Sequence, residues 1–224
     1  MLIVTGASRG LGRFILDHYA ANEPAVGTYL TTPPPAERDL FQLDVTKEED
    51  VKRFFNEISP RLKDITLINC AGTNANSRLG KFEASAFRQV VDVAVTGSFL
   101  MIKHALQFMQ GENFGRIINI SSVVPQIGVP GTVAYSAAKS ALWGMTKTVA
   151  KECAGSNITC NCLTLGYFEI GMISEVPEKM RNHLLSTIPM KRFGDPINVV
   201  HAIDFVRKSD YLTGSSIELN GGLF

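Results

Sequence analysis

Three side chains in the second half of the chain have the types and spacing for proton transfer. Tyr135 and Lys139 are four residues apart, so in a helix they share one face, and Ser122 lies 13 residues before Tyr135. A phenol exchanges its proton poorly near neutral pH, but a cation one turn away stabilises the phenolate. Each residue also fits a structural role on its own, as a packed ring, a solvated charge or a loop hydroxyl. Together they predict a catalytic acid or base, its tuning cation and a hydrogen-bond donor for a substrate oxygen.

A glycine-rich turn near the N-terminus has the pattern of a phosphate-binding loop. An apolar run leads into Thr5-Gly6-Ala7-Ser8-Arg9-Gly10-Leu11-Gly12, after which a helical pattern begins. Glycines at such a turn let the backbone approach a pyrophosphate, and the positive end of the following helix favours its charge. An ordinary strand-to-helix turn is the alternative. The position directly after the first strand predicts a dinucleotide site with contacts at Gly6, Ser8, Arg9, Gly10, Leu11 and Gly12.

The end of the second predicted strand bears on which dinucleotide binds. This position reads Tyr29-Leu30-Thr31-Thr32 and lacks the acidic residue that would bind the ribose 2′-hydroxyl of NAD. Arg9 could pair with a 2′-phosphate, although a solvated loop charge is the alternative. We therefore expect NADP(H) to be favoured over NAD(H). Hydride would then pass between the nicotinamide and a substrate carbonyl carbon.

The elements that must position these residues alternate between short apolar runs and helical patterns, which is typical of a parallel α/β sheet. Seven strands are predicted, at 1–4, 25–29, 40–43, 65–70, 116–120, 158–163 and 216–219. Helices are predicted at 10–22, 47–59, 85–110, 133–154, 177–186 and 198–208. Because several strands are almost continuously apolar, helices should cover both faces of the sheet.

Two local patterns give more detailed expectations. Thr46 and Glu49 read as a capping box at the start of the second helix. Pro33-Pro34-Pro35 forbids a helix through the middle of the second crossover, so we expect a stiff extended connection there.

Composition narrows the class of protein. With 224 residues, of which 45% are apolar and 19% charged, one domain spanning 1–224 is expected. The net charge of +1 argues against nucleic acid or a membrane surface as a partner. No charged leader or long apolar run is evident, so a cytoplasmic location is expected. The four cysteines, at positions 70, 153, 160 and 162, are too few for a disulfide scaffold and lack further ligands for a metal, so they read as buried thiols.

Five motifs resemble those of the short-chain dehydrogenase/reductase family, with the ketoacyl-reductase-like branch nearest. They are TGASRGLG at 5–12, NCAG at 69–72, ISS at 120–122, YSAAK at 135–139 and NGG at 220–222, and they span essentially the whole chain. The resemblance implies a single Rossmann-type, doubly wound sheet in the order 3-2-1-4-5-6-7. It also implies NADP(H) or NAD(H) as cofactor, a Tyr-Lys-Ser site, and commonly a homotetramer or homodimer.

The family's roles map onto matching positions of this sequence. The resemblance implies that Tyr135 is the catalytic acid/base, that Ser122 donates to the substrate oxygen, and that Lys139 binds the nicotinamide ribose and tunes the tyrosine. It further implies cofactor contacts at Asp44 and Val45 near adenine, at Asn69, Ala71 and Gly72 around the adenosine ribose, and at Gly166 and Phe168 near the nicotinamide amide.

Two positions depart from the family pattern. Ala94 stands where the family usually has an asparagine that holds a water for proton relay toward the lysine, and we expect backbone carbonyls to hold that water instead. Ile170 replaces a threonine that would contact the carboxamide or pyrophosphate, so cofactor affinity is expected to be lower.

The expected substrate contacts are Gln126, Ile127 and Tyr167, which are mostly apolar with a few polar handles and suit a small carbonyl or hydroxy compound. Basic side chains follow at 179, 181, 191 and 192, with His183, and could meet a carboxylate or phosphate or simply be solvated. Two functions stay open. One is an NADP(H)-dependent reductase or alcohol dehydrogenase, and the other is a catalytically weak NADP-binding sensor or partner subunit.

Overall fold

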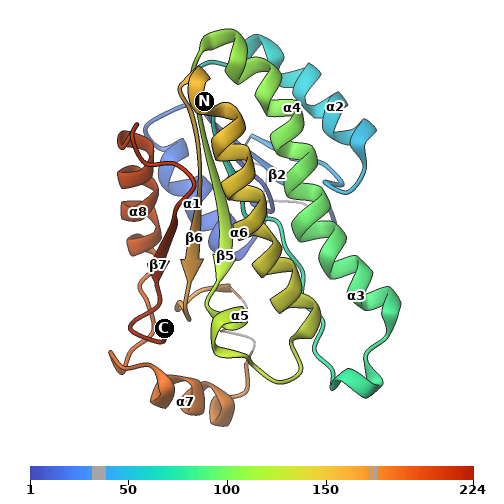
Figure 1. Cartoon of the computed structure of the whole chain (residues 1–224), viewed down its shortest axis with the longest axis vertical. Coiled ribbons are helices and arrows are strands. Elements are labelled where there is room, and N and C mark those ends of the chain that lie inside the picture. Colours follow the sequence, from blue (N-terminus) through green and yellow to red (C-terminus); the bar gives the residue numbers. More distant parts are fainter. Residues whose placement is uncertain (32–38, 172, 174–175) are drawn as a thin grey trace.

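The parallel sheet forms as the alternating pattern predicts. The computed structural model describes residues 1–31, 39–171, 173 and 176–224, so the proline-rich connection at 33–35 lies outside the described residues. Within them one sheet has the order β3-β2-β1-β4-β5-β6-β7, with every pair parallel (Figure 1). Its strands are β1 (Leu2–Val4), β2 (Ala25–Tyr29), β3 (Leu40–Gln42), β4 (Thr66–Asn69), β5 (Gly115–Ser122), β6 (Ile158–Leu165) and β7 (Ser216–Leu219). The predicted strand order and seven-stranded sheet are confirmed.

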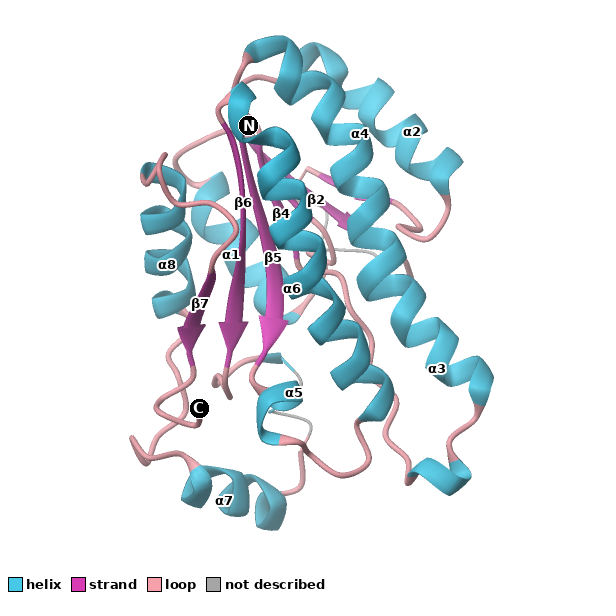
Figure 2. Ribbon diagram, in the orientation of Figure 1, coloured by secondary structure: helices cyan, strands magenta, loops and turns pink. Residues whose placement is uncertain are grey.

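Helices cover both faces of this sheet. They are α1 (Gly10–Ala20), α2 (Glu48–Ile58), α3 (Ala84–Val91), α4 (Gly97–Glu112), α5 (Val124–Ile127), α6 (Val133–Cys153), α7 (Glu178–Thr187) and α8 (Ile197–Lys208), with 3₁₀ turns at Ser59–Arg61, Leu79–Lys81 and Ala154–Ser156. Helices α2, α4 and α6 pack on one face, and α1 and α8 on the other (Figure 2). Every residue of β5 and β6 is buried, which is consistent with helices covering both faces of the sheet at these central strands.

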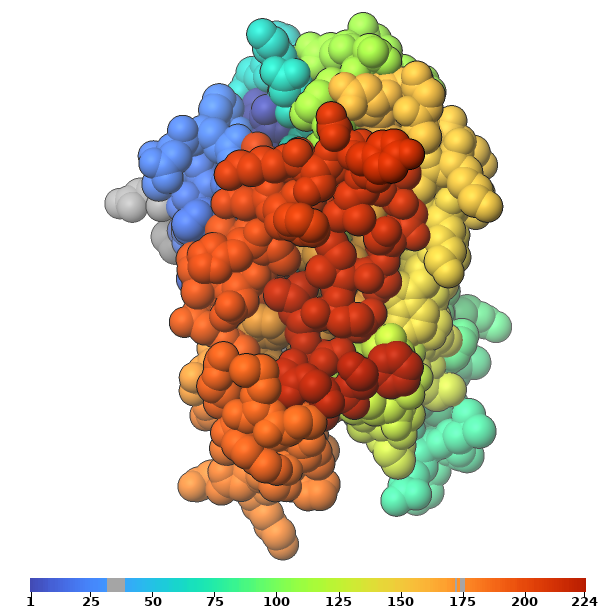
Figure 3. Space-filling model, turned by 60° about the vertical axis from the view of Figure 1, so that its left-hand side comes forward, coloured from blue at the N-terminus to red at the C-terminus, as the bar shows by residue number. Residues whose placement is uncertain are grey.

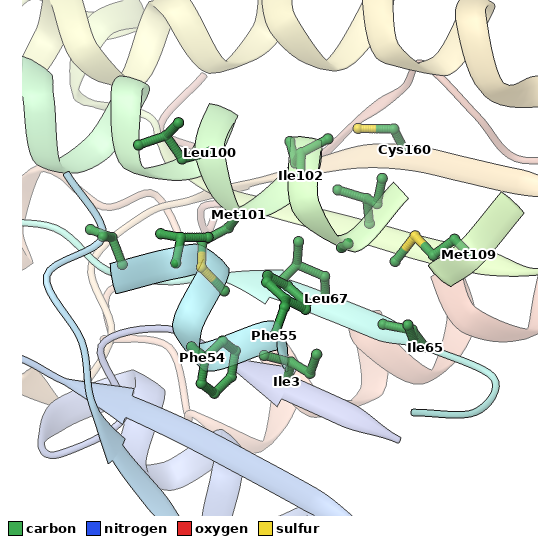
Figure 4. Packing of buried hydrophobic residues seen from close by; sticks show 14 of the residues in the cluster. Ile3, Phe54, Phe55, Ile65, Leu67, Leu100, Met101, Ile102, Met109 and Cys160 are labelled. Carbon is green, nitrogen blue, oxygen red and sulfur yellow. The ribbon is translucent and has the colours of Figure 1, made fainter. Parts of the chain in front are cut away.

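The core on the α2/α4 face is built around aromatic side chains of α2. Phe54 and Phe55 point from α2 toward Ile3 and Leu67 of the sheet (Figure 4). Their ring centroids lie 5.2 Å apart in an edge-on arrangement, and Phe55 is 2% exposed. This packing fixes the position of α2 and therefore of the loop that precedes it, which carries Asp44 and Val45.

The predicted helix over 85–110 is interrupted. Helix α3 leads through a wide π turn at Asp92–Thr96 into α4, so the backbone shifts within a pattern that reads as one continuous helix. Within the stretch Ala84–Glu112, an 18-residue window has a mean hydropathy of 1.2, so by length and composition alone the stretch could span a membrane. Its buried members, such as Met101 and Ala105, pack in the core, which accounts for this composition.

Two local predictions are corrected. The capping box is wrong, because the Thr46 hydroxyl donates to Asp44 Oδ1 (2.7 Å), the N-cap is Lys47, and Glu49 accepts from Lys52. The carboxylate of an aspartate two residues before a threonine competes with the helix backbone for a hydrogen bond to the threonine hydroxyl. Strand β5 also runs two residues further than predicted, so Ser122 is its last residue instead of lying just beyond it. Pairing with β6 up to Leu165 extends the strand to this point.

The aromatic packing gives a stability prediction. Replacing Phe55 by alanine should lower the free energy of unfolding by about 3–5 kcal/mol, because it leaves a cavity in a fully packed core. Chemical denaturation measures this change. Glu57→Ala, at an exposed position of the same helix, is the matched control and should change stability by about 0.5 kcal/mol or less. Equal losses in both variants would contradict the assignment of Phe55 to the core.

Candidate active site

The glycine loop forms a cradle at the carboxyl end of β1. Gly6 (φ +67°) and Gly10 (φ +57°) adopt the left-handed conformation that favours glycine. A Cβ at Gly6 would lie 2.8 Å from the Ala71 Cα, and one at Gly12 would lie 2.4 Å from the Gly6 carbonyl oxygen. The loop can therefore be this tight only because glycine has no side chain, and its backbone is left accessible to a ligand.

The start of α1 suits an anionic group. The helix begins at Gly10, its N-cap is Arg9, no side chain caps it, and its first turn contains no acidic residue. Backbone amides and the positive helix end are thus directed at the loop. The residues present fit the pyrophosphate of a dinucleotide. Gly6, Ser8, Arg9, Gly10, Leu11 and Gly12 all lie in this loop and first turn.

The NCAG motif is tied to this loop. The Thr5 hydroxyl accepts hydrogen bonds from the backbone N–H groups of Cys70 (3.0 Å) and Ala71 (2.9 Å), so residues 70–72 lie beside the cradle. The Asn69 side chain is buried and donates to Asn119 Oδ1 inside the sheet (2.9 Å). The predicted contacts of Asn69, Ala71 and Gly72 with an adenosine ribose stay predictions.

Asp44 presents an ionised carboxylate just after β3, at the same edge of the sheet as the cradle. Partial burial acts to raise its pKa, but hydrogen bonds from the Thr46 hydroxyl and backbone and the nearby Lys47 ammonium outweigh burial and lower the pKa. Val45 packs against Gly97, where a Cβ would come within 2.6 Å of the valine side chain. The predicted contact of Asp44 and Val45 with adenine stays a prediction, and an ionised acceptor is suited to an amino group.

The catalytic candidates meet at the carboxyl edge of β5. Lys139 on α6 is buried, and its ammonium donates to the Ile120 carbonyl at 2.7 Å, while the Ser121 hydroxyl donates to the Lys139 carbonyl at 2.9 Å. These reciprocal bonds hold α6 against β5. Among the described residues no carboxylate pairs with this ammonium, so its further N–H donors suit the hydroxyl groups of a ligand.

Tyr135 and Ser122 complete this set. The Lys139 ammonium lies 5.7 Å from the centre of the Tyr135 ring, as the four-residue spacing predicts. The Ser122 hydroxyl oxygen accepts a hydrogen bond from the Val124 N–H at 3.2 Å, which orients it at the start of α5. The structure thus brings a phenol, an ammonium and a hydroxyl to one edge of the sheet.

The π turn beside Tyr135 was not evident from the sequence. Ala94, at its centre, is buried against Ala134, Ala138 and Tyr135. The Ser98 hydroxyl donates to the Ala94 carbonyl at 2.7 Å. Sequence reasoning missed Ser98, and the only available signal was a small polar residue four positions after Ala94.

The residues that follow β6 lie beside the glycine loop. Gly166 packs on Asn220, and Phe168 forms a parallel bridge with Gly194. Ile170 is partly buried and packs against the core of the α1/α8 face, and the Gly171 backbone lies next to Gly10, where a Cβ would be 3.3 Å from the Gly171 Cα. The side chain that replaces the expected threonine therefore packs against the hydrophobic core. Gly171 and Gly194 are site neighbours that sequence reasoning missed.

The expected substrate residues come from two elements. Gln126 and Ile127 belong to α5, and the buried Gln126 Oε1 has no hydrogen-bond partner among the described residues. Tyr167 packs on a cluster that contains Ile173, Ile188 and Phe193. Burial raises the pKa of Tyr167, and the proximity of Tyr135 adds to the effect. Tyr167 therefore lies near the Tyr135 phenol.

The two cysteines of β6 are buried in the sheet. Burial raises the pKa of Cys160 to about 12 and that of Cys162 to about 11, so both stay thiols near neutral pH. Within the described ranges no group of three metal-ligating side chains comes together.

Comparison with known proteins agrees with this geometry. The family described as enoyl-(acyl carrier protein) reductase matches residues 15–224. The chain belongs to the short-chain dehydrogenase/reductase family. It is 36% identical to an acetoacetyl-CoA reductase of Allochromatium vinosum over 83% of this chain and 76% of the relative. It is 32% identical to a 3-oxoacyl-(acyl-carrier-protein) reductase of Aquifex aeolicus over 99% of this chain and 96% of the relative.

A solved structure extends the likeness to the fold. A candidate gluconate dehydrogenase from Agrobacterium tumefaciens superposes with a TM-score of 0.89 at 25% identity, covering 100% of this chain and 95% of that chain. The predicted family, the ketoacyl-reductase-like branch and the assignment as an oxidoreductase enzyme are confirmed.

The tight cradle gives a binding prediction. Gly12→Ala should weaken NADPH binding by about tenfold or more, equivalent to about 1.4 kcal/mol, because the new Cβ forces the Gly6 carbonyl out of place. Titration of nicotinamide fluorescence measures the affinity. Gly144→Ala is the control, since nothing lies within 4 Å of a Cβ on this exposed position of α6. Unchanged affinity in Gly12→Ala would show that the cradle does not hold the cofactor.

Proposed function

We propose that the protein is an NADP(H)-dependent reductase that transfers hydride between a nicotinamide and the carbonyl carbon of a small substrate. A 3-oxoacyl thioester is the substrate class that the names of its relatives favour. The proposal is supported above all by the reciprocal bonds between Lys139 and β5, which hold the ammonium one turn from Tyr135 and beside Ser122.

In this proposal, Tyr135, Ser122 and Lys139 each have a separate role in the proton transfer. When bound, a reduced nicotinamide supplies hydride to the carbonyl carbon. Tyr135 gives its proton to the carbonyl oxygen as that oxygen gains negative charge, and the Ser122 hydroxyl donates a hydrogen bond to the same oxygen. Lys139 stabilises the resulting phenolate until a proton from water restores it.

The choice of cofactor follows from the adenosine side of the cradle. Strand β2 ends at Tyr29 without an acidic side chain that would repel a 2′-phosphate. Arg9, at the N-cap of α1, offers a guanidinium for such a phosphate. These features favour NADP(H) over NAD(H).

The substrate side combines an apolar wall with a few polar groups. Ile127 and Tyr167 offer the apolar contact surface, and the unpartnered Gln126 Oε1 offers a buried acceptor for an N–H or O–H of the substrate. A cytoplasmic location and a homodimer or homotetramer accompany the proposal, by analogy with the family.

A binding protein without significant turnover is the second candidate. Ala94 lacks the side chain expected for a proton relay, and Ile170 lacks the hydroxyl expected near the cofactor. Such a protein would serve as an NADP sensor or as the partner subunit of an active reductase.

Tyr135→Phe separates these functions. With NADPH and a panel of ketones and 3-oxoacyl thioesters, the substitution should lower turnover by about a hundredfold or more while NADPH still binds, because only the proton donor is lost. Tyr211→Phe, at a fully exposed tyrosine, is the control and should retain full turnover. Equal turnover in Tyr135→Phe and the unmodified protein would refute the mechanism, and NADPH binding without turnover of any substrate would support the sensor.

Arg9→Ala tests the cofactor preference. Loss of the guanidinium should raise the KM for NADPH by about tenfold and leave the KM for NADH within about twofold, since only NADPH carries the 2′-phosphate. Steady-state kinetics with each cofactor measures the ratio. Arg13→Ala, one helical turn further along α1, is the matched control. A parallel rise for both cofactors would mean that Arg9 only shapes the loop.

A further inference from the structure

Helix α6 is joined to the sheet by side-chain hydrogen bonds at three points along its length. The helix lies along β5 and β6 (Figure 2). The three bonds run from the Ser121 hydroxyl to the Lys139 carbonyl (2.9 Å), from the Trp143 indole N–H to the Thr164 hydroxyl (3.0 Å) and from the Asn119 amide to the Thr146 hydroxyl (2.9 Å). They are called the α6–sheet bonds below. Because their α6 members are spaced four and three residues apart, the bonds lie on one side of the helix.

The apolar contacts of α6 do not determine its position along the sheet. Its buried side chains include Ala138, Leu142 and Ala150. Apolar contact is non-directional and scales with the area buried. The outer face of the helix, which includes Ala137 and Gly144, is exposed to solvent and is seen in part as the yellow surface in Figure 3. Apolar contact therefore holds α6 against the sheet without fixing its place along the helix axis.

The α6–sheet bonds can fix that place because hydrogen bonds depend on distance and angle. A shift of α6 by two residues, about 3 Å along its axis, would break all three bonds. Asn119 and Thr164 are 0% exposed and Thr146 is 1% exposed, so water would not replace the lost partners. A buried donor without a partner costs more free energy than a satisfied hydrogen bond contributes. Other positions of α6 are therefore disfavoured.

The amide of Asn119 is itself held in one orientation. Its Oδ1 accepts a hydrogen bond from the Asn69 Nδ2 at 2.9 Å, which leaves its own Nδ2 to donate to Thr146. Asn69 directly precedes residues 70–72, which lie beside the glycine loop. Buried hydrogen bonds thus connect the edge of the cradle with the helix that carries Tyr135.

The geometry of the site depends on the position of α6. Tyr135 and Lys139 are on the same helix, so their relation does not change when the helix moves. Tyr135 and Ser122 are on different elements, α6 and β5, so a shift of the helix changes the distance between them. In the proposed reaction both must reach one carbonyl oxygen, and a misplacement of about 1 Å can lower a rate about a hundredfold.

We propose that the α6–sheet bonds set the position of Tyr135 relative to Ser122, and that Ser121 and Thr146 are therefore positioning residues of the reductase. Thr146 lies about three helical turns after Tyr135, so it acts through the helix and does not touch the substrate. The inference rests on the proposed function and adds residues outside the set of Tyr135, Lys139 and Ser122.

Thr146→Val tests the proposal, because it keeps the shape of the side chain and removes the hydroxyl. With NADPH and acetoacetyl-CoA, or the substrate of the panel that is reduced fastest, kcat should fall about tenfold while both KM values stay within about twofold. Thr146→Ser retains the hydroxyl and should restore kcat to within about twofold. Thr159→Val is the matched control. Thr159 is also buried, but its hydroxyl has no hydrogen-bond partner among the described residues, so kcat should not change.

A double-mutant cycle separates positioning from a general loss of structure. Thr146→Val should lower the residual turnover of Tyr135→Phe by less than about twofold, because no phenolic hydroxyl is left to position. Ser121→Ala should behave like Thr146→Val in both backgrounds. It provides the test if Thr146→Val does not fold.

The fluorescence of Trp143 gives a measurement that needs no turnover. Trp143 is the only tryptophan in the chain, and its indole N–H is bonded to Thr164. Its emission maximum should shift in Thr146→Val and in Ser121→Ala, because the helix loses its fixed place on the sheet. The emission of Thr159→Val should equal that of the unmodified protein.

The outcomes separate this inference from the proposed function. An unchanged kcat in both Thr146→Val and Ser121→Ala would overturn the positioning role. Equal losses with and without the Tyr135 hydroxyl, or a Thr146→Ser variant as slow as Thr146→Val, would overturn it as well. If the unmodified protein reduced no ketone or thioester, the proposed function would fail, and the emission of Trp143 would still show whether the α6–sheet bonds hold the helix in place.

Discussion

The site depends on how a buried ammonium is held. Lys139 is 6% exposed, and a charge removed from water is costly unless it is hydrogen bonded or paired. The Lys139 ammonium donates to the Ile120 carbonyl, and the Ser121 hydroxyl donates to the Lys139 carbonyl, so Lys139 is bound to β5 through both its side chain and its backbone. Because α6 is rigid, this fastening also places Tyr135 one turn away. Because Ser122 follows Ser121 in the same strand, this attachment also places Ser122, the proposed hydrogen-bond donor to the substrate.

Sequence reasoning succeeded where one local rule determines the structure. Glycine at positions 6 and 12 signals backbone crowding, and a four-residue spacing in a helix fixes the relation of Tyr135 to Lys139. It failed where two local rules compete. Thr46 has both a helix N-terminus and the Asp44 carboxylate within reach, and the nearer carboxylate wins. The π turn at Asp92–Thr96 likewise leaves the apolar periodicity almost unchanged while shifting the backbone.

Contacts between segments that are far apart in the sequence could not be predicted for another reason. Gly171 lies beside Gly10 and the Leu11 backbone, although about 160 residues separate these segments along the chain. No local pattern records such a contact, because it follows from the adjacency of β1, β4, β5 and β6 in the sheet. The resemblance to the family identifies Ile170 as a departure from the family's sequence pattern. Only the structure shows that its side chain packs against the core.

The same packing couples the loop after β6 to the residues that follow α7. The Phe168 ring fills the space where a Cβ of Gly194 would lie, at 2.6 Å, and the Phe168 backbone forms a bridge with Gly194. Any side chain at position 194 would therefore push on the residue whose backbone the family places at the nicotinamide. Since residues 191–193 lead directly into Gly194, the residues that follow α7 (Glu178–Thr187) are joined to the loop after β6 at this bridge. Hydride transfer needs its donor and acceptor in a fixed relative position, and a backbone bridge between two segments at the carboxyl edge of the sheet favours such a fixed arrangement.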